Sequence, residues 1–209
     1  MKDFWNSEIT EASWIGLQEL RKEIAFVLIG GWATYLYSRL QKSKDIDIII
    51  DYNTLRALES RYTLSKNERL KKYEIKTERY DVDIYLPGYS PLTLPPKEIM
   101  SRYTTMVEGF SVPTPEALMA LKLGAAAERG ASTKGRKDSI DILGLLFYSG
   151  FDVQLFSELL KEHGLVQYMR LLKSVLEGFD KNDIDYLNLN QNSFARLKRM
   201  HLSTITKYL

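Results

Sequence analysis

One stretch of the chain, from Gly30 to Asp51, constrains its fold more than any other. An apolar run over residues 25–29 is short, rich in residues that favour β-structure, and ends at Gly30-Gly31. Such a run predicts a buried strand. Residues 32–40 carry apolar side chains at helical spacing, so the sequence predicts a strand, a glycine turn and a helix in direct succession.

A second strand is predicted over residues 45–50, and it places two carboxylates beside the glycine turn. Successive side chains of a strand point to opposite faces, so Asp45 and Asp47 share one face and three isoleucines share the other. Glycine lets a phosphate approach the backbone, and the N–H groups at a helix N-terminus bind anions. Crowded carboxylates repel each other unless a cation lies between them, and Mg²⁺ prefers oxygen ligands. Together these features would serve a nucleoside triphosphate (NTP).

The same residues carry a family resemblance. Gly30-Gly31, thirteen further residues and then Asp45-Ile46-Asp47 resemble the motif of the DNA polymerase beta-like nucleotidyltransferase superfamily. The form Gly-Gly-Trp-Ala, with Ser43 two residues before Asp45, is most similar to AbiEii-like toxin nucleotidyltransferases and to antibiotic nucleotidyltransferases. The resemblance covers residues 24–146. It implies that the nucleotide phosphates are held by Gly30, Gly31, Thr34 and Ser43.

The sequence departs from the family pattern just before the aspartate pair. Relatives often have Arg-x-Thr there, whereas this chain has Gln41 in the arginine position and Ser43 in the threonine position. Serine can still donate a hydrogen bond, but glutamine removes a cation. Nucleotide binding would then depend on a substitute cation from Lys42, Lys44 or Arg39.

A third carboxylate is expected on a later strand. Residues 72–77 and 79–86 are predicted to be two strands joined by a tight turn, and Asp81 and Asp83 share one face of the second. The resemblance implies a third acidic residue beside the first pair, for which we prefer Asp83, with Asp81 as the alternative. Three carboxylates, Asp45, Asp47 and Asp83, fit a site for two Mg²⁺ ions. Asp83 would also accept the proton of the attacking hydroxyl.

Cationic residues of the predicted nucleotide site come from the next helices. Thr114 is a good N-cap for a helix in which Lys122 lies among apolar neighbours, where its charge is costly unless an anion neutralises it. The resemblance implies that Lys122 faces the phosphates. Residues 129–137 are interpreted as a basic loop, and Lys137 is assigned to the nucleotide site. Asp138 and Asp141 share a helical face, from which they would orient Lys122 or Lys137 or cap the helix.

The fold class that follows is α/β (α+β). A nucleotidyltransferase domain with a small mixed sheet and helices is expected over residues 1–112, followed by an α-helical domain over residues 113–209. Asn6 or Ser7 would cap a first helical segment over residues 3–23, and Trp32 is expected to pack in the core. The other predicted elements are a helix from an Asn53 cap to Arg61, a helix over 97–102, a strand over 104–112, and helices over 139–149, 152–163, 165–178 and 192–207.

Composition excludes several classes of protein. The 209 residues carry a net charge of +2, which argues neither for nor against a nucleic-acid partner. There is no cysteine, and the two histidines, His163 and His201, are far apart in sequence, so we expect no zinc site. No apolar run is long enough for a membrane span and the N-terminus lacks a signal-peptide pattern. We therefore expect a cytoplasmic protein with no membrane partner.

The sequence as a whole predicts a Mg²⁺-dependent enzyme that moves a nucleoside monophosphate from an NTP to a hydroxyl, releasing pyrophosphate. The acceptor is left open between a tRNA or a partner protein, as for a toxin–antitoxin enzyme, and a small antibiotic-like molecule. The first predicts binding that weakens steeply with salt, and the second an acidic cleft. A non-catalytic binding module with the same fold is the third alternative.

Overall fold

The structure is a computed structural model that describes residues 3–130 and 132–209. Within them a seven-stranded sheet has the order β3-β4-β5-β2-β1-β7-β6. The strands are β1 (Val27–Ile29), β2 (Ile46–Ile49), β3 (Ser65–Asn67), β4 (Lys72–Lys76), β5 (Asp81–Tyr85), β6 (Thr104–Val107) and β7 (Phe110–Pro113). The sheet is mixed, because β2 pairs in parallel with β5, and β1 with β7, while the other neighbours are antiparallel.

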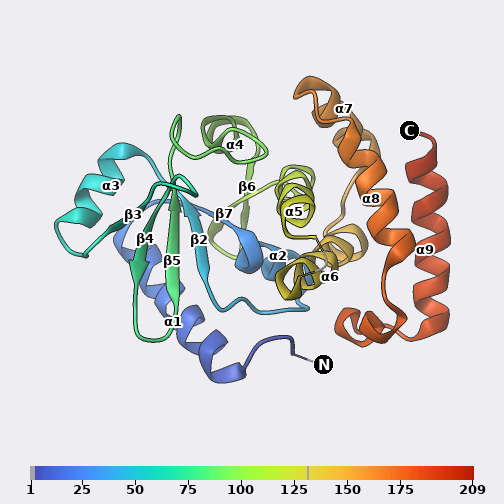
Figure 1. Ribbon diagram of the computed structural model, residues 1–209, viewed down its shortest axis with the longest axis horizontal. Helices are drawn as coiled ribbons and strands as arrows, with labels where there is room; N and C mark the ends of the chain where they lie inside the picture. Colours follow the sequence, from blue (N-terminus) through green and yellow to red (C-terminus); the bar gives the residue numbers. More distant parts are fainter. Residues whose placement is uncertain (1–2, 131) are drawn as a thin grey trace.

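The helices lie mostly to one side of this sheet. Figure 1 shows α5 to α9 gathered on that side, with α2 between the sheet and α6. Helices α5 and α6 pack against each other and against α2. The helices are α1 (Ser7–Glu23), α2 (Gly30–Ser38), α3 (Tyr52–Glu59), α4 (Pro96–Arg102), α5 (Pro115–Arg129), α6 (Thr133–Tyr148), α7 (Val153–Glu162), α8 (Gln167–Gly178) and α9 (Gln191–Thr206), with a 3-10 helix, η1 (Lys181–Leu187), before α9.

The centre of the sheet is held by apolar burial on β1 and β2. Ile46, Ile48 and Ile50 are fully buried, as expected for the face opposite the aspartates. Trp32 is also fully buried, and its Nε1 donates a hydrogen bond to Ser13 Oγ at 2.9 Å. Its predicted packing role is confirmed. This core fixes the first turn of α2 against β2, which is what positions the site described below.

The fold class predicted from the sequence, a mixed sheet with helices followed by a helical region, is confirmed. Asn6 caps α1, and Thr114 caps α5 through its hydroxyl, as predicted. The division into two domains after residue 112 stays a prediction. Among the described residues, no helix combines the length and the apolar character that crossing a bilayer requires.

Several predicted elements need correction. The single strand over 104–112 is a hairpin, because Glu108 and Gly109 both have positive φ and turn the chain between β6 and β7. Helix α3 is capped by Asp51 and not by Asn53, since the Asp51 carboxylate accepts the Thr54 N–H. The predicted basic loop over 129–137 is mostly helical, with α6 beginning at Thr133; residue 131 of that segment lies outside the described residues. Strand β3 and helix η1 were not predicted.

Candidate functional site

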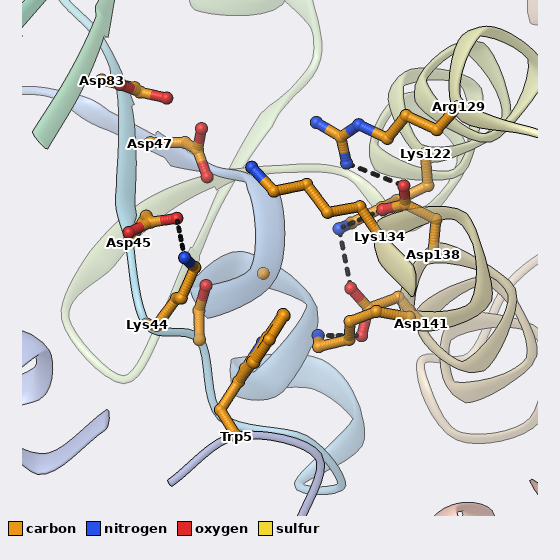
Figure 2. Close-up of a pocket in the computed structure, with 13 residues that line it drawn as sticks. Trp5, Lys44, Asp45, Asp47, Asp83, Lys122, Arg129, Lys134, Asp138 and Asp141 are labelled. Carbon is orange, nitrogen blue, oxygen red and sulfur yellow. Dashed lines mark hydrogen bonds and ion pairs between the residues drawn. The ribbon is translucent and has the colours of Figure 1, made fainter. Parts of the chain in front are cut away.

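A cleft lies where β2, β5 and the first turn of α2 face α5 and α6, and Figure 2 shows the side chains around it. Its lining is dominated by charged groups from both sides. The lining residues are Trp5, Gly31, Ser43, Lys44, Asp45, Asp47, Asp83, Lys122, Arg129, Lys134, Lys137, Asp138 and Asp141.

The predicted carboxylates meet in this cleft. Strands β2 and β5 are parallel neighbours, and their register places Asp47 directly beside Asp83. Asp45 precedes β2 and lines the same cleft. Asp81 pairs in register with Lys76 on β4 and is not among the described lining residues. Of the two alternatives for the third carboxylate, the structure therefore brings Asp83 to the first pair.

Asp47 carries the strongest sign of crowded negative charge. Burial, followed by repulsion from Asp83 and Asp45, raises the pKa of its carboxyl from 3.8 to about 7, although Lys122 opposes the shift. The Tyr85 hydroxyl lies 3.4 Å from Asp47 Oδ1, a long hydrogen bond. For Asp47, burial and the neighbouring carboxylates therefore outweigh the attraction of the nearby lysines.

Asp83 and Asp45 each have a lysine nearby. Lys72 Nζ lies 2.5 Å from Asp83 Oδ2 and 3.1 Å from Glu74, and its side chain is buried. Lys44 Nζ lies 3.8 Å from Asp45 Oδ2. As they stand, no three acidic or histidine side chains in the described part of the chain are close enough to hold a metal ion together.

Magnesium nevertheless fits the chemistry of these groups. All three side chains offer carboxylate oxygens, the ligands that Mg²⁺ prefers. Burial and the neighbouring carboxylates raise the pKa of Asp47, so an added cation would stabilise the ionised form of this carboxylate. Asp45, Asp47 and Asp83 are the residues that would hold such an ion, with Lys72 competing for Asp83.

Positions 30 and 31 require glycine because neighbouring side chains lie directly against the backbone there. Gly30 has φ of +69°, and a Cβ at this position would collide with the Asp47 carboxylate. A Cβ on Gly31 would lie 2.6 Å from Ser43 Oγ. Helix α2 starts at Gly30, and within the described residues no side chain caps its first turn. The N-terminus of α2 is therefore available to an anion in the cleft.

Thr34 does not reach the cleft, which corrects the predicted phosphate contact. Its side chain is 1% exposed, and its hydroxyl donates a 3.0 Å hydrogen bond to the Gly30 carbonyl one turn earlier. Threonine commonly bonds back to the carbonyl of the preceding turn inside a helix. Ser43, by contrast, lines the cleft beside Gly31.

Two predicted lysines form a buried network with two aspartates. Lys122 Nζ lies 2.7 Å from Asp141 and 3.3 Å from Asp138, while Lys137 Nζ lies 2.6 Å from the other Asp141 oxygen. Burial lowers the pKa of Lys122, but Asp141 and Asp138 outweigh it and hold the pKa above its usual value. Burial dominates for Lys137 and lowers its pKa. The aspartates thus orient both lysines, and Ser132 takes the role of helix cap.

A further lysine, Lys134, is exposed and extends across the cleft. Figure 2 shows its side chain reaching from α6 toward Asp47. No carboxylate in the described part of the chain forms an ion pair with it, unlike Arg129, whose Nη1 lies 2.7 Å from Asp138. Lys134 is the cation of this cleft best placed to meet an added anion.

Gln41 is not among the described residues that line the cleft. Its side chain accepts the Phe4 N–H at 2.9 Å and donates to the Tyr186 carbonyl at 3.0 Å. Of the suggested substitute cations only Lys44 lines the cleft. Lys42 and Arg39 pair with other residues, Glu11 and Glu108.

Two side chains at the site were missed by sequence reasoning. Trp5 lines the cleft from the segment before α1, and nothing in its local sequence indicates this. Lys72 had a faint signal, since it shares a strand face with Glu74 and alternation alone predicts that these two charged side chains lie together. Its pairing with Asp83 depends on the β4–β5 register, which the sequence leaves open.

Comparison with known proteins identifies the fold. No family model and no curated protein matches the chain. The crystal structure of JHP933 from Helicobacter pylori is similar with a TM-score of 0.51 and 18% identity, over 97% of this chain and 94% of that one. An antigenic nucleotidyltransferase-like protein from Paracoccidioides brasiliensis has a TM-score of 0.41 and 17% identity, over 80% of this chain and 93% of that one. The chain shares its fold with JHP933 along nearly the whole of both proteins.

Proposed function

We propose that the protein is a Mg²⁺-dependent nucleotidyltransferase that moves a nucleoside monophosphate from an NTP to a hydroxyl. One observation carries the proposal. Asp45, Asp47 and Asp83 line one cleft together with the glycine start of α2 and with Lys134, and within residues 3–130 and 132–209 no side chain caps that start and no carboxylate pairs with that lysine. An acidic cluster and an anion-binding surface in one cleft suit a metal-bound polyphosphate better than either ligand alone.

The triphosphate would be held by groups on both walls of the cleft. The first N–H groups of α2 would donate to an anion, and glycine at positions 30 and 31 lets Asp47 and Ser43 lie against the start of this helix. Ser43 would donate a hydrogen bond, and Lys134 would move onto the phosphates. Lys122 and Lys137 would add positive charge from the α5 and α6 side of the cleft, where Asp138 and Asp141 hold them in place.

The reaction would proceed by in-line displacement. The acceptor oxygen forms a bond to the α-phosphorus, the bond from that phosphorus to the bridging oxygen of the β-phosphate breaks, and pyrophosphate leaves with the electron pair. The acceptor proton passes to Asp83 Oδ1, since Lys72 holds Oδ2. Burial raises the pKa of Asp83, with Lys72 opposing it, which makes this carboxylate a better base than an exposed aspartate.

Magnesium, when bound by Asp45, Asp47 and Asp83, would neutralise phosphate charge and make the acceptor hydroxyl more acidic. The protein residues supply the rest of the chemistry by binding and orientation. The acceptor, whether tRNA, a protein or a small hydroxyl compound, stays a prediction.

The test is transfer of label from each α-³²P-labelled NTP, with Mg²⁺, onto total tRNA, cell protein or a set of small hydroxyl compounds. We expect one class of acceptor to become labelled, and Asp47→Asn to abolish the transfer while the protein stays folded. Asp81→Asn is the matched control, because Asp81 lies on the same sheet but outside the cleft. Full transfer by Asp47→Asn would refute the proposed role of the cleft.

A further inference from the structure

Among the described residues that line the cleft, Trp5 is the one with an aromatic side chain; the others are charged residues, glycine and serine. We propose that Trp5 is the stacking platform for the base of the bound nucleotide. The inference rests on the proposed function and deepens it, because it assigns the donor's base to one end of the cleft. Trp5 stacks through its ring face, so the platform takes any base and favours the larger purines.

The placement of Trp5 fits a nucleotide laid along the cleft. Figure 2 shows Trp5 at the opposite end of the labelled group from Asp83, with Asp47, Asp45 and Lys44 between them. Its ring points from the N-terminal segment toward the middle of this group. A nucleotide with its base on Trp5 would extend its phosphates toward the start of α2 and the aspartates.

Trp5 is held in this position by contacts that reach the C-terminal helices. Its ring packs edge-on against Phe4, with centroids 4.9 Å apart, and Phe4 packs against Tyr186 of η1 at 5.6 Å. The Phe4 N–H donates to Gln41, and Gln41 donates to the Tyr186 carbonyl. A platform fixed before the ligand binds loses little conformational entropy on binding.

The surroundings of Trp5 also favour a π-stacked ligand. Lys44 Nζ lies 5.3 Å from the Trp5 ring centroid and 3.8 Å from Asp45 Oδ2, so it connects the aromatic end to the acidic end. The side chain of Trp5 is only partly buried, although tryptophan is usually well covered. A partly exposed aromatic ring in an ionic cleft gains from a flat ligand that covers more of it.

The other two tryptophans cannot serve this role. Trp32 is fully buried, and Trp14 packs against Trp32, Tyr35 and Phe110. Neither lines the cleft. The substitution Trp5→Ala therefore removes the proposed platform and leaves the other indole rings in place.

The test is calorimetric titration of the full-length protein with ATP, UTP and inorganic tripolyphosphate, each with Mg²⁺. Tripolyphosphate has the phosphates but no base, so it separates stacking from phosphate binding. We expect Trp5→Ala to weaken ATP binding roughly 5- to 150-fold, the range for loss of one aromatic–base stack. Tripolyphosphate affinity should not change, the loss for UTP should be smaller than for ATP, and Trp5→Phe should keep most of the affinity.

Tyr52→Ala is the matched control, because Tyr52 is 47% exposed on α3 and does not line the cleft. Unchanged ATP affinity in Trp5→Ala would overturn the inference while leaving the proposed function standing. An equal loss for ATP and tripolyphosphate would also overturn it, because Trp5 would then act on the whole cleft. Failure of the wild-type protein to bind any NTP would instead overturn the proposed function, and the inference with it.

Discussion

The substitution Asp141→Asn should destabilise the protein more than any other single charge removal in the cleft. Asp141 is 2% exposed, and its two oxygens accept hydrogen bonds from Lys122 at 2.7 Å and from Lys137 at 2.6 Å. Without this carboxylate, Lys122 keeps Asp138 at 3.3 Å, while Lys137 loses its ion pair. Two buried ammonium groups would then share a single buried carboxylate that Arg129 also uses.

The size of the effect follows from the cost of an uncompensated buried charge. Breaking a buried ion pair by removing one partner costs about 3–5 kcal/mol. In a protein of 150–250 residues, each kcal/mol lowers the melting temperature by about 2–4 °C. We therefore expect the melting temperature of Asp141→Asn to fall by about 6–20 °C.

Thermal unfolding followed by circular dichroism at pH 7 measures this change. Asp185→Asn is the control, because Asp185 is an exposed aspartate on η1. Adding Lys137→Met to Asp141→Asn should restore part of the lost stability, since it removes the ammonium group left without its partner. Melting of Asp141→Asn within 1 °C or so of the control would refute the reasoning that the network holds the helical wall of the cleft.

Two further predictions concern the aspartate strand. Gly30→Ala and Gly88→Ala each place a side chain at positive φ, which costs about 1–2 kcal/mol. Only the new methyl group of Gly30→Ala collides with Asp47, so this variant alone should lose Mg²⁺-dependent NTP binding in calorimetry. Equal NTP binding by the two variants would contradict this. In metal-free protein the pKa of Asp47 is raised from 3.8 to about 7, so the folded state binds the proton more tightly and loses stability as pH rises through this range. Urea unfolding in EDTA should therefore show Asp47→Asn gaining on the wild type between pH 4 and pH 8, by up to about 4 kcal/mol, whereas a constant difference would mean that the carboxylate is well solvated.

The parts of the site that sequence reasoning placed well are those set by local chain geometry. Asp45 and Asp47 had to share a face because strand side chains alternate, and the run of isoleucines between and after them fixed which face is buried. Gly30 ended an apolar strand and preceded an amphipathic helix, so its turn conformation was expected from residue type alone.

The parts that sequence reasoning could not place depend on long-range pairing. Asp83 could be preferred to Asp81 only through a family resemblance, and it is the β2–β5 register that sets it beside Asp47. Lys72 joins the site through the register between β4 and β5. Trp5 joins it through the hydrogen bond from its neighbour Phe4 to Gln41, two residues that are 37 positions apart in the sequence. No periodicity or propensity encodes contacts of this kind.

Thr34 shows a different reason for a wrong expectation. It lies one turn after Gly30, close enough in sequence for a phosphate contact to be plausible. A helical threonine, however, can satisfy its hydroxyl on its own backbone, and here it bonds to the Gly30 carbonyl. Whether such a hydroxyl bonds to a ligand or to the backbone depends on packing, and the Thr34 side chain is buried where α2 packs against its neighbours.

The most direct test of the account is isothermal titration calorimetry of the purified protein with each of the four NTPs, in Mg²⁺ and in EDTA. The account predicts binding of at least one NTP in Mg²⁺, with binding sharply weakened in EDTA and in Asp47→Asn. Binding should survive in Asp81→Asn, whose carboxylate lies outside the cleft. Absence of binding for all four NTPs in Mg²⁺, or affinity that is the same in EDTA, would contradict the claim that these carboxylates and the start of α2 form a nucleotide site.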